Sequence, residues 1–439
     1  MTLSKQEYRR PPHRRRWLQI SAALLCLLAV LLIIVFFNRD RFQNQAAKSS
    51  HTNNTNQVAK AEKVEVSDQE LQINEGNKAL LRVPSVKPER FYKASQVNIA
   101  YPKEGVRGIY LSAHGMGTPS ILERNINLLD STGLNSVVID VKSDWGSIAT
   151  QLPTDNDLVK KNEEITFNGQ EMMQTFEEKQ IYPIARITTF KDTYAAQAHP
   201  DWSFKKSNGE IWSDAGGQTF LNPYNKDVWA YVVDVAKGAA ELGFKDIQFD
   251  YVRFPEGFEN FGTSLVYDMG DYAHYGKDSV EGRCQAITDF LAYAQKELRP
   301  YGVDVSADIF GYVTTIGAAP GIGQDFTDIA NTVDVVSSMI YPSHWSNGDF
   351  GFTAPDLEPY GVVDNYMDVE DLRLENIDGD HAHSRPWLQA FTASYLANGT
   401  YQEYTNVEIE EQIQALRDHG VYEYLLWNAA NDYPSNVDY

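Results

Sequence analysis

The sequence predicts an α/β fold, a (β/α)8 barrel of the TIM type, and three observations support this prediction. The chain has 439 residues, which is long enough for a barrel of roughly 250 residues with long loops and further segments. From Ala100 onward, short β-branched runs alternate with amphipathic stretches, the pattern of parallel βαβ units. Eight such runs are present, and eight favours a closed barrel over an open doubly wound sheet.

The predicted strands are short and rich in Val, Ile, Phe and Tyr, and amphipathic helices separate them. We expect the strands at 106–113, 136–142, 181–188, 246–254, 303–312, 333–341, 386–391 and 423–427. We expect the helices at 119–131, 170–179, 226–242, 280–298, 326–331, 357–374 and 407–419. The doubly wound alternative would place a glycine-rich nucleotide loop after the first strand. The sequence there is His114-Gly115-Met116-Gly117, which lacks the required spacing and predicts a turn.

The N-terminal part of the chain has a different character. Its first 41 residues carry eight Lys/Arg against two acids, a net charge of +6. Residues 18–37 form an apolar run, long enough for a helix that spans roughly 30 Å of hydrocarbon. The basic flank predicts a cytoplasmic tail at 1–17, a retained signal-anchor at 18–37 and an extracellular C-terminal part, so that the protein crosses the cell membrane once. A cleaved signal peptide is the alternative, but its apolar core is usually shorter.

The remaining chain is acidic and contains a polar connecting segment. Residues 38–99 are irregular and polar and predict a flexible linker, which leaves 100–439 for the barrel. After the first 41 residues, 30 Lys/Arg stand against 58 acids, a net charge of −28. Such a surface repels phosphates, so we expect no nucleic-acid partner. Cys26 and Cys284 are the two cysteines, too few for a disulfide framework.

Reactive side chains in such a barrel lie at the C-terminal ends of its strands. The strand period of two places Gln248 and Asp250 on one face of the fourth strand. It likewise places Ser306 and Asp308 on one face of the fifth. Two carboxyl groups side by side suit glycosidic cleavage, which needs a carboxylate facing the anomeric carbon and a carboxylic acid for the leaving oxygen. We therefore predict Asp250 as the central catalytic carboxylate and Asp308 as the acid.

Each of these assignments has an alternative. A carboxylate that follows an apolar strand is costly to bury without a purpose, which favours a catalytic Asp250. A structural ion pair between Asp250 and Arg253 or Arg186 is the competing interpretation. The predicted acid also has two rivals in the neighbouring loops, Glu256 and Asp144.

Aromatic and polar side chains at the strand ends favour a saccharide cleft. Ring faces stack on sugar C–H faces while polar groups fix the hydroxyls. Each ring taken alone is more typical of core or rim packing, but as a set they favour the cleft. The predicted substrate-binding residues are Asp140, Lys142, Trp145, Arg186, Tyr251, Arg253, Tyr341, His344, Trp345, Gln389, Trp427 and Asn428. No His-x-His pair follows the first strand and no Gly-x-Ser-x-Gly elbow is present, so we predict neither a metal nor a cofactor.

Seven of these strand motifs resemble a bacterial family of glycoside-hydrolase-like barrels that was long catalogued as a domain of unknown function. The resemblance covers roughly 106–432, and the strand-four motif is the most specific. The motifs are Gly108-Ile-Tyr-Leu-Ser-Ala, Val138-Ile-Asp-Val-Lys, Tyr182-Pro-Ile-Ala-Arg-Ile, Phe249-Asp-Tyr-Val-Arg-Phe-Pro, Ser306-Ala-Asp-Ile-Phe-Gly, Met339-Ile-Tyr-Pro-Ser-His-Trp and Leu426-Trp-Asn.

The resemblance implies a barrel distantly similar to α-amylase-like enzymes. Several of those carry a nucleophilic Asp at the end of strand four and an acid on strand five, positions that Asp250 and Asp308 match. One departure is Gln248, because the α-amylase-like pattern has Arg two residues before the strand-four Asp.

The sequence thus predicts a membrane-tethered extracellular glycosidase that acts on cell-wall or secreted polysaccharide. A non-catalytic saccharide-binding barrel that scaffolds cell-envelope assembly is the main alternative. A third interpretation, cleavage of an amide in the wall peptide, needs a metal or nucleophile that the sequence does not display.

Overall fold

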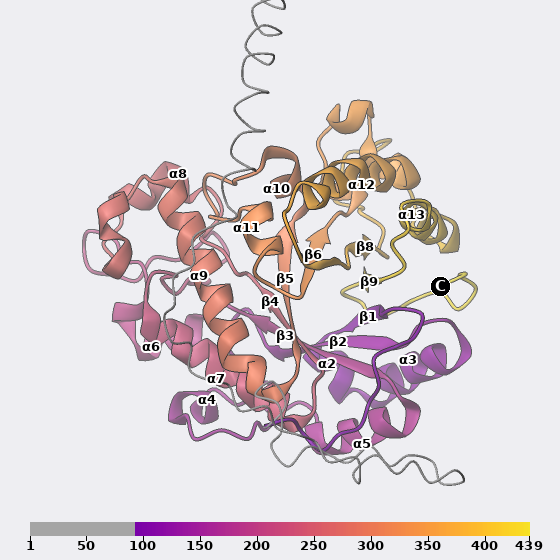
Figure 1. Cartoon of the computed structure of the whole chain (residues 1–439), viewed down its shortest axis with the longest axis horizontal. Helices are drawn as coiled ribbons and strands as arrows, with labels where there is room; N and C mark the ends of the chain where they lie inside the picture. Colours follow the sequence, from indigo (N-terminus) through magenta and orange to yellow (C-terminus); the bar gives the residue numbers. More distant parts are fainter. Residues whose placement is uncertain (1–92) are drawn as a thin grey trace, which may run out of the picture. The chain divides into compact units, whose positions relative to one another are not determined.

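Residues 93–439 are described by the computed structural model, and within them parallel strands close into a barrel (Figure 1). The neighbouring pairs run from β1 to β6 in chain order, then through β8 and β9 back to β1. The strands are β1 (Arg107–Leu111), β2 (Ser136–Lys142), β3 (Tyr182–Thr188), β4 (Asp246–Asp250), β5 (Asp304–Phe310), β6 (Val335–Met339), β7 (His383–Ser384), β8 (Trp387–Gln389) and β9 (Tyr424–Trp427).

The seventh position of the barrel is shared by two short strands. Both β7 and β8 pair with β6, and Arg385 and Pro386 lie between them. Proline has no N–H to donate to a strand ladder, which accounts for the interruption. The nine strands therefore make a closed barrel of eight positions, and the predicted barrel is confirmed.

Helices cover the outside of the barrel, and polar caps fix where they begin (Figure 1). The longer ones are α3 (Pro119–Ser131), α5 (Gly169–Lys179), α7 (Lys226–Leu242), α9 (Val280–Leu298), α12 (Pro359–Glu375) and α13 (Asn406–Asp418). The shorter ones are α2 (Ala113–Gly117), α4 (Asp157–Lys161), α6 (Thr193–Ala198), α8 (Phe258–Phe261), α10 (Gly311–Ile316) and α11 (Phe326–Ala330). Asn225 caps α7 through the Asp227 N–H, and Thr405 and Glu408 form a capping box at α13.

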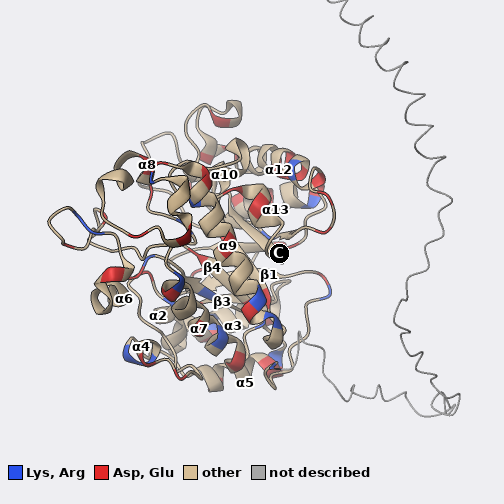
Figure 2. Cartoon of the chain, turned by 60° about the vertical axis from the view of Figure 1, so that its left-hand side comes forward, with Lys and Arg blue, Asp and Glu red and all other residues tan. Residues whose placement is uncertain are grey.

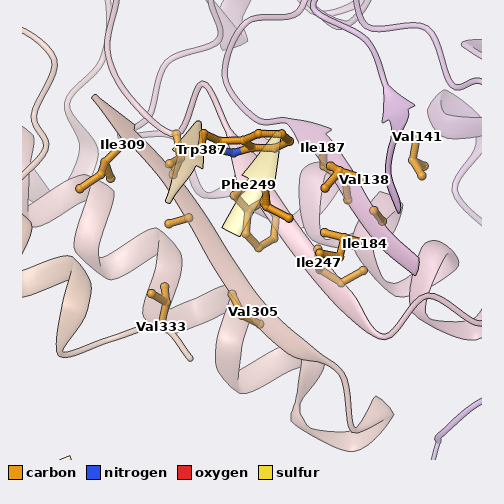
Figure 3. Packing of buried hydrophobic residues seen from close by; sticks show 14 of the residues in the cluster. Val138, Val141, Ile184, Ile187, Ile247, Phe249, Val305, Ile309, Val333 and Trp387 are labelled. Carbon is orange, nitrogen blue, oxygen red and sulfur yellow. The ribbon is translucent and has the colours of Figure 1, made fainter. Parts of the chain in front are cut away.

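The barrel and its helices share one apolar core. All seven residues of β3 are buried, because β3 is covered by helices on one face and by the barrel interior on the other. Figure 3 shows part of the packing, from Val138 on β2 and Ile247 on β4 to Trp387 on β8. Burial of such side chains is the main stabilising contribution, at about 25 cal/mol per Å² of apolar surface.

Two long loops form one side of the barrel mouth. The segment 189–225 follows β3 and the segment 251–279 follows β4, and their aromatic rings pack against each other. The Phe204 ring lies 4.8 Å from that of Phe258, and Trp212 stacks on Phe261 at 4.9 Å. These ring contacts form an aromatic cluster that holds the two loops together above the barrel.

Among residues 93–439, no helix has both the length and the apolar character needed to cross a membrane. The predicted cytoplasmic tail (1–17), the predicted anchor (18–37) and the predicted linker up to residue 92 lie outside the described residues. The last predicted linker residues pack on the barrel, where Ile99 is buried and the Asn98 N–H donates to Glu177. The packed part of the chain therefore begins before residue 100.

Candidate active site

Arg186 joins two carboxylates at the C-terminal end of the barrel. It occupies the position on β3 that pairs with Gln248 on β4. Its Nε and Nη2 donate to Asp250 Oδ2 at 2.9 and 2.5 Å, and Nη1 donates to Asp140 Oδ1 at 2.5 Å. Burial lowers the pKa of Arg186, but the facing charges of Asp250 and Asp140 outweigh it and raise that pKa above its usual value.

The second oxygen of Asp250 is held by the backbone. The Tyr251 N–H donates to Asp250 Oδ1 at 2.6 Å. Tyr251 adopts a left-handed conformation with φ 48°, which costs a non-glycine residue on the order of 1–3 kcal/mol. Lys191 and Arg253 lie 4.9 and 4.7 Å from the centre of the Tyr251 ring. The strained turn, fixed by these cation–π contacts, gives the Asp250 carboxylate a single orientation.

Asp308 follows in register on the neighbouring strand. The β4–β5 pairing runs from Asp246 opposite Asp304 to Phe249 opposite Ala307, so the next positions, Asp250 and Asp308, are neighbours. Asp308 is buried, and its Oδ1 accepts a hydrogen bond of 2.8 Å from Trp387 Nε1. Burial, and then the negative charge of Asp250, raise the pKa of Asp308 well above its usual value. One carboxyl is thus ion-paired while the raised pKa of its neighbour favours the protonated form, the division of roles that acid catalysis beside a carboxylate requires.

A cavity of about 230 Å³ opens above these two carboxyl groups. Burial lowers the pKa of His344 in its wall, so this imidazole is neutral at pH 7. Larger hollows occur elsewhere on the described surface, and none of them is lined by Asp250 or Asp308. The cavity wall consists of Arg186, Asp250, Tyr251, Arg253, Glu256, Asp308, Phe310, Met339, Tyr341, His344, Trp387 and Trp427.

Most of the residues chosen from the sequence line this cavity, and a few lie elsewhere. Asp140 lies behind it, bound to Arg186 and to the Tyr110 hydroxyl. Lys142 is fully buried away from it, with Nζ 2.9 Å from Asp192. The strand register shifts between Asp140 and Lys142, so a strict period of two fails at this strand end and Lys142 serves as an internal ion-pair partner.

Four further predicted residues do not line the cavity. Trp145 is 45% exposed on the loop after β2. Trp345 packs against Phe350, and Gln389 is buried under the loops. Asn428, in the turn after β9, donates to the backbone carbonyls of Ala390 and Asp432.

Three cavity residues were not anticipated as ligands, namely Phe310, Met339 and Trp387. Strand periodicity could have identified Met339, because it precedes Tyr341 by two residues. Within residues 93–439, no group of three or more His, Cys, Asp or Glu is arranged to hold a metal ion.

Comparison with known proteins identifies a family and a similar fold. Residues 108–433 match the family described as "Putative glycosyl hydrolase domain". A hypothetical protein from Ruminiclostridium thermocellum is 33% identical over 46% of this chain and 96% of its own, with a TM-score of 0.39. The PgaB (BpsB) glycoside hydrolase domain from Bordetella bronchiseptica is 16% identical over 74% of this chain and 94% of its own, with a TM-score of 0.50, a similarity of fold.

No curated protein matches the sequence. The family match covers most of the chain, and it confirms the resemblance expected from the strand motifs. The chain belongs to the family described as "Putative glycosyl hydrolase domain".

Proposed function

We propose that this protein is a glycoside hydrolase that cleaves cell-wall or secreted polysaccharide outside the cell. The observation that carries the proposal is the pair Asp250 and Asp308, two neighbouring carboxyl groups at an open, aromatic cavity. Asp250 is ion-paired with Arg186, whereas burial raises the pKa of Asp308. The extracellular location and the membrane anchor rest on the sequence alone, on the basic residues before the apolar run 18–37.

In this mechanism Asp308 protonates the glycosidic oxygen as the bond to the anomeric carbon breaks. Asp250, ionised through Arg186, attacks the anomeric carbon or activates a water molecule. Neighbouring strands lie about 4.7–4.9 Å apart, which suits the separation of about 5–5.5 Å in retaining enzymes better than the roughly 6.5–9.5 Å of inverting ones. We therefore favour Asp250 as the nucleophile, with the anomeric configuration retained.

The aromatic wall supports a saccharide as the ligand. Trp427 and Tyr341 line the cavity beside the carboxyl pair, and the neutral His344 offers a hydrogen-bonding group. Flat ring faces next to hydrogen-bonding groups are the usual surroundings of a bound sugar.

One observation favours the alternative, a barrel that binds saccharide without cleaving it. Both oxygens of Asp250 already accept hydrogen bonds, from Arg186 and from the Tyr251 N–H. A purely structural ion pair would have the same contacts, so the proposal depends on a kinetic test.

The test is release of reducing ends by the full-length protein in mild detergent, on a panel of cell-wall and secreted polysaccharides. We expect the parent to release product and Asp250→Asn and Asp308→Asn not to. Asp130→Asn is the matched control, because Asp130 is a half-exposed acid on α3 outside the cavity. A parent that binds glycans but releases nothing from any of them would make the barrel a binding module.

A further inference from the structure

Arg253 is the second guanidinium in the cavity wall, and its surroundings differ from those of Arg186. It is buried, with its guanidinium carbon 4.7 Å from the ring centre of Tyr251 and 4.8 Å from that of Phe310. Its Nη1 donates to the Phe254 carbonyl at 3.2 Å, and its Nη2 donates to Glu256 at 3.0 Å. Stacking between rings fixes the plane of the guanidinium at the edge of the cavity.

The charges on the two arginines are balanced differently. Arg186 faces two mostly buried carboxylates. Arg253 has one carboxylate partner among the described residues, Glu256, whose side chain is 70% exposed. A guanidinium has five N–H donors, and the two hydrogen bonds of Arg253 leave three of them without a protein acceptor. Because the Glu256 side chain lies mostly in water, its attraction to Arg253 is screened, so Glu256 holds Arg253 weakly.

A ligand that fills the cavity changes this balance. It excludes water from the N–H groups of Arg253 that have no acceptor among the described residues, and donors of a charged group are costly to bury without an acceptor. The hydroxyls of a neutral sugar can accept hydrogen bonds but bring no charge. A carboxylate brings both, because its two oxygens match two parallel N–H groups of a guanidinium.

We propose that the cavity recognises an acidic saccharide, with the carboxylate of a uronic-acid unit or a comparable carboxyl-bearing sugar bound to Arg253. This inference rests on the proposed function and specifies the substrate class of the same site. The carboxylate of the substrate would take the place of Glu256 beside Arg253, and Glu256 would move into solvent.

The acidic surface of the protein opposes this recognition only at long range. Figure 2 shows Asp and Glu spread over the helices and loops of the described part. At physiological ionic strength, repulsion between exposed charges decays over about 8 Å. A carboxylate in contact with Arg253 lies within that distance of its partner and is stabilised, whereas most of the surface acids act from farther away.

The inference is tested by calorimetric binding to the full-length protein in mild detergent at 0.15 M salt. The probes are mono- and trisaccharides of glucuronic, galacturonic and mannuronic acid, each compared with its neutral methyl ester. Asp308→Asn serves as the background, so that turnover does not consume the probe. We expect at least one acid to bind at least tenfold more tightly than its ester.

Three variants sharpen this test. Arg253→Gln is expected to abolish the preference for the acid, because binding of the acid should weaken far more than binding of the ester. Arg253→Lys is expected to retain only part of the preference, because lysine keeps the positive charge but lacks the two parallel N–H groups that bind both oxygens of a carboxylate. Glu256→Gln is expected to increase the preference, since it removes the internal competitor.

The results separate this inference from the proposed function. Esters that bind as well as every acid in the parent protein overturn the acidic specificity, as does an unchanged preference in Arg253→Gln. Cleavage of neutral glycans without any acid preference would leave the hydrolase standing and remove this inference. A clear acid preference without cleavage of any glycan would leave the inference standing and remove the hydrolase.

Discussion

Two clusters at opposite ends of the barrel contain the same kinds of residue. At the C-terminal end, Arg186 bridges Asp250 and Asp140, and the Tyr110 hydroxyl donates to Asp140 at 2.5 Å. We call these four residues the upper cluster. Each of them extends into the barrel interior from a different strand.

The N-terminal end repeats this arrangement. Arg385 donates to Asp246 at 2.7 Å and to Glu423 at 2.8 Å, and the Tyr101 hydroxyl donates to Glu423 at 2.5 Å. We call these four residues the lower cluster. β4 supplies an aspartate to each cluster, one at its first residue and one at its last.

The clusters differ in what lies next to them. Arg385 and Asp246 are fully buried, and the hollows on that side reach Glu423 and Tyr101 but neither of these two. The upper cluster opens into the aromatic cavity and has Asp308 as its neighbour. An arginine between carboxylates is therefore compatible with a purely structural role. The candidate active site is distinguished by the adjacent Asp308, whose pKa is raised, and by the cavity.

The largest expected effect tests this distinction through activity. Asp250→Asn or Asp308→Asn should lower the rate of product release by about 10²–10⁴-fold, the usual contribution of a positioned acid or base. Glu423→Gln in the lower cluster should leave the rate per folded molecule unchanged. Initial rates, normalised to folded protein by circular dichroism, provide the measurement. An equal loss in Glu423→Gln would mean that the two clusters are not functionally distinct.

The second effect concerns stability. Arg385→Gln leaves Asp246 and Glu423 without their cation, and it should lower the free energy of unfolding by about 3–5 kcal/mol at pH 8. Burial raises the pKa of Asp246 to about 6. At pH 5 this carboxyl takes up a proton, so the loss should be smaller there. Urea denaturation at both pH values checks this, and an equal loss at pH 5 and pH 8 would contradict it.

The third effect is the pH dependence of the upper cluster. Burial and the charge of Asp250 raise the pKa of Asp308, so kcat/KM should fall about tenfold per pH unit once the pH exceeds that value. The folded protein also keeps this proton above about pH 4, where an unfolded carboxyl has released it. The stability contributed by Asp308 therefore declines as the pH rises from about 4. A rate that keeps increasing at alkaline pH would exclude Asp308 as the acid.

The smallest effect compares the two tyrosines. Tyr110→Phe removes a buried hydrogen bond to a charged acceptor and should cost about 1.5–3 kcal/mol. Tyr101→Phe removes a bond of the same kind, but Tyr101 is 46% exposed, so water replaces the hydroxyl and the cost should be smaller. Chemical denaturation gives the free energy of unfolding of both variants. A larger loss in Tyr101→Phe than in Tyr110→Phe would contradict the prediction.

The fold was predictable because the strand and helix periods are unusually clear. The helices at 119–131, 226–242 and 280–298 are confirmed residue by residue. In these segments the apolar period and the caps indicate the same boundaries. The break between β7 and β8 was missed, although Pro386 after Arg385 is the kind of signal that interrupts a strand.

The site was less predictable, because it depends on which side chains meet across strands. Asp250 and Asp308 follow from periodicity, and the structure makes them neighbours. Their roles stay predictions. The ion pair between Arg186 and Asp250 was one of the alternatives expected from the sequence. The contact of Arg186 with Asp140 and the burial of Lys142 depend on strand register, which the sequence does not specify. Long-range pairing of this kind is visible only once the barrel is closed.

The buried contact between Lys142 and Asp192 affects how the C-terminal end of the barrel accommodates a polysaccharide. Asp192 also caps α6 through the Ala195 N–H and accepts from the Tyr231 hydroxyl on α7. The start of the loop after β3 is thus fastened both to the barrel and to its outer helix. Fixing a residue's backbone costs roughly 1–2 kcal/mol, and here folding has already done it. The start of this loop is therefore a fixed part of the cavity rim, and a long polysaccharide can enter without a movement of this segment.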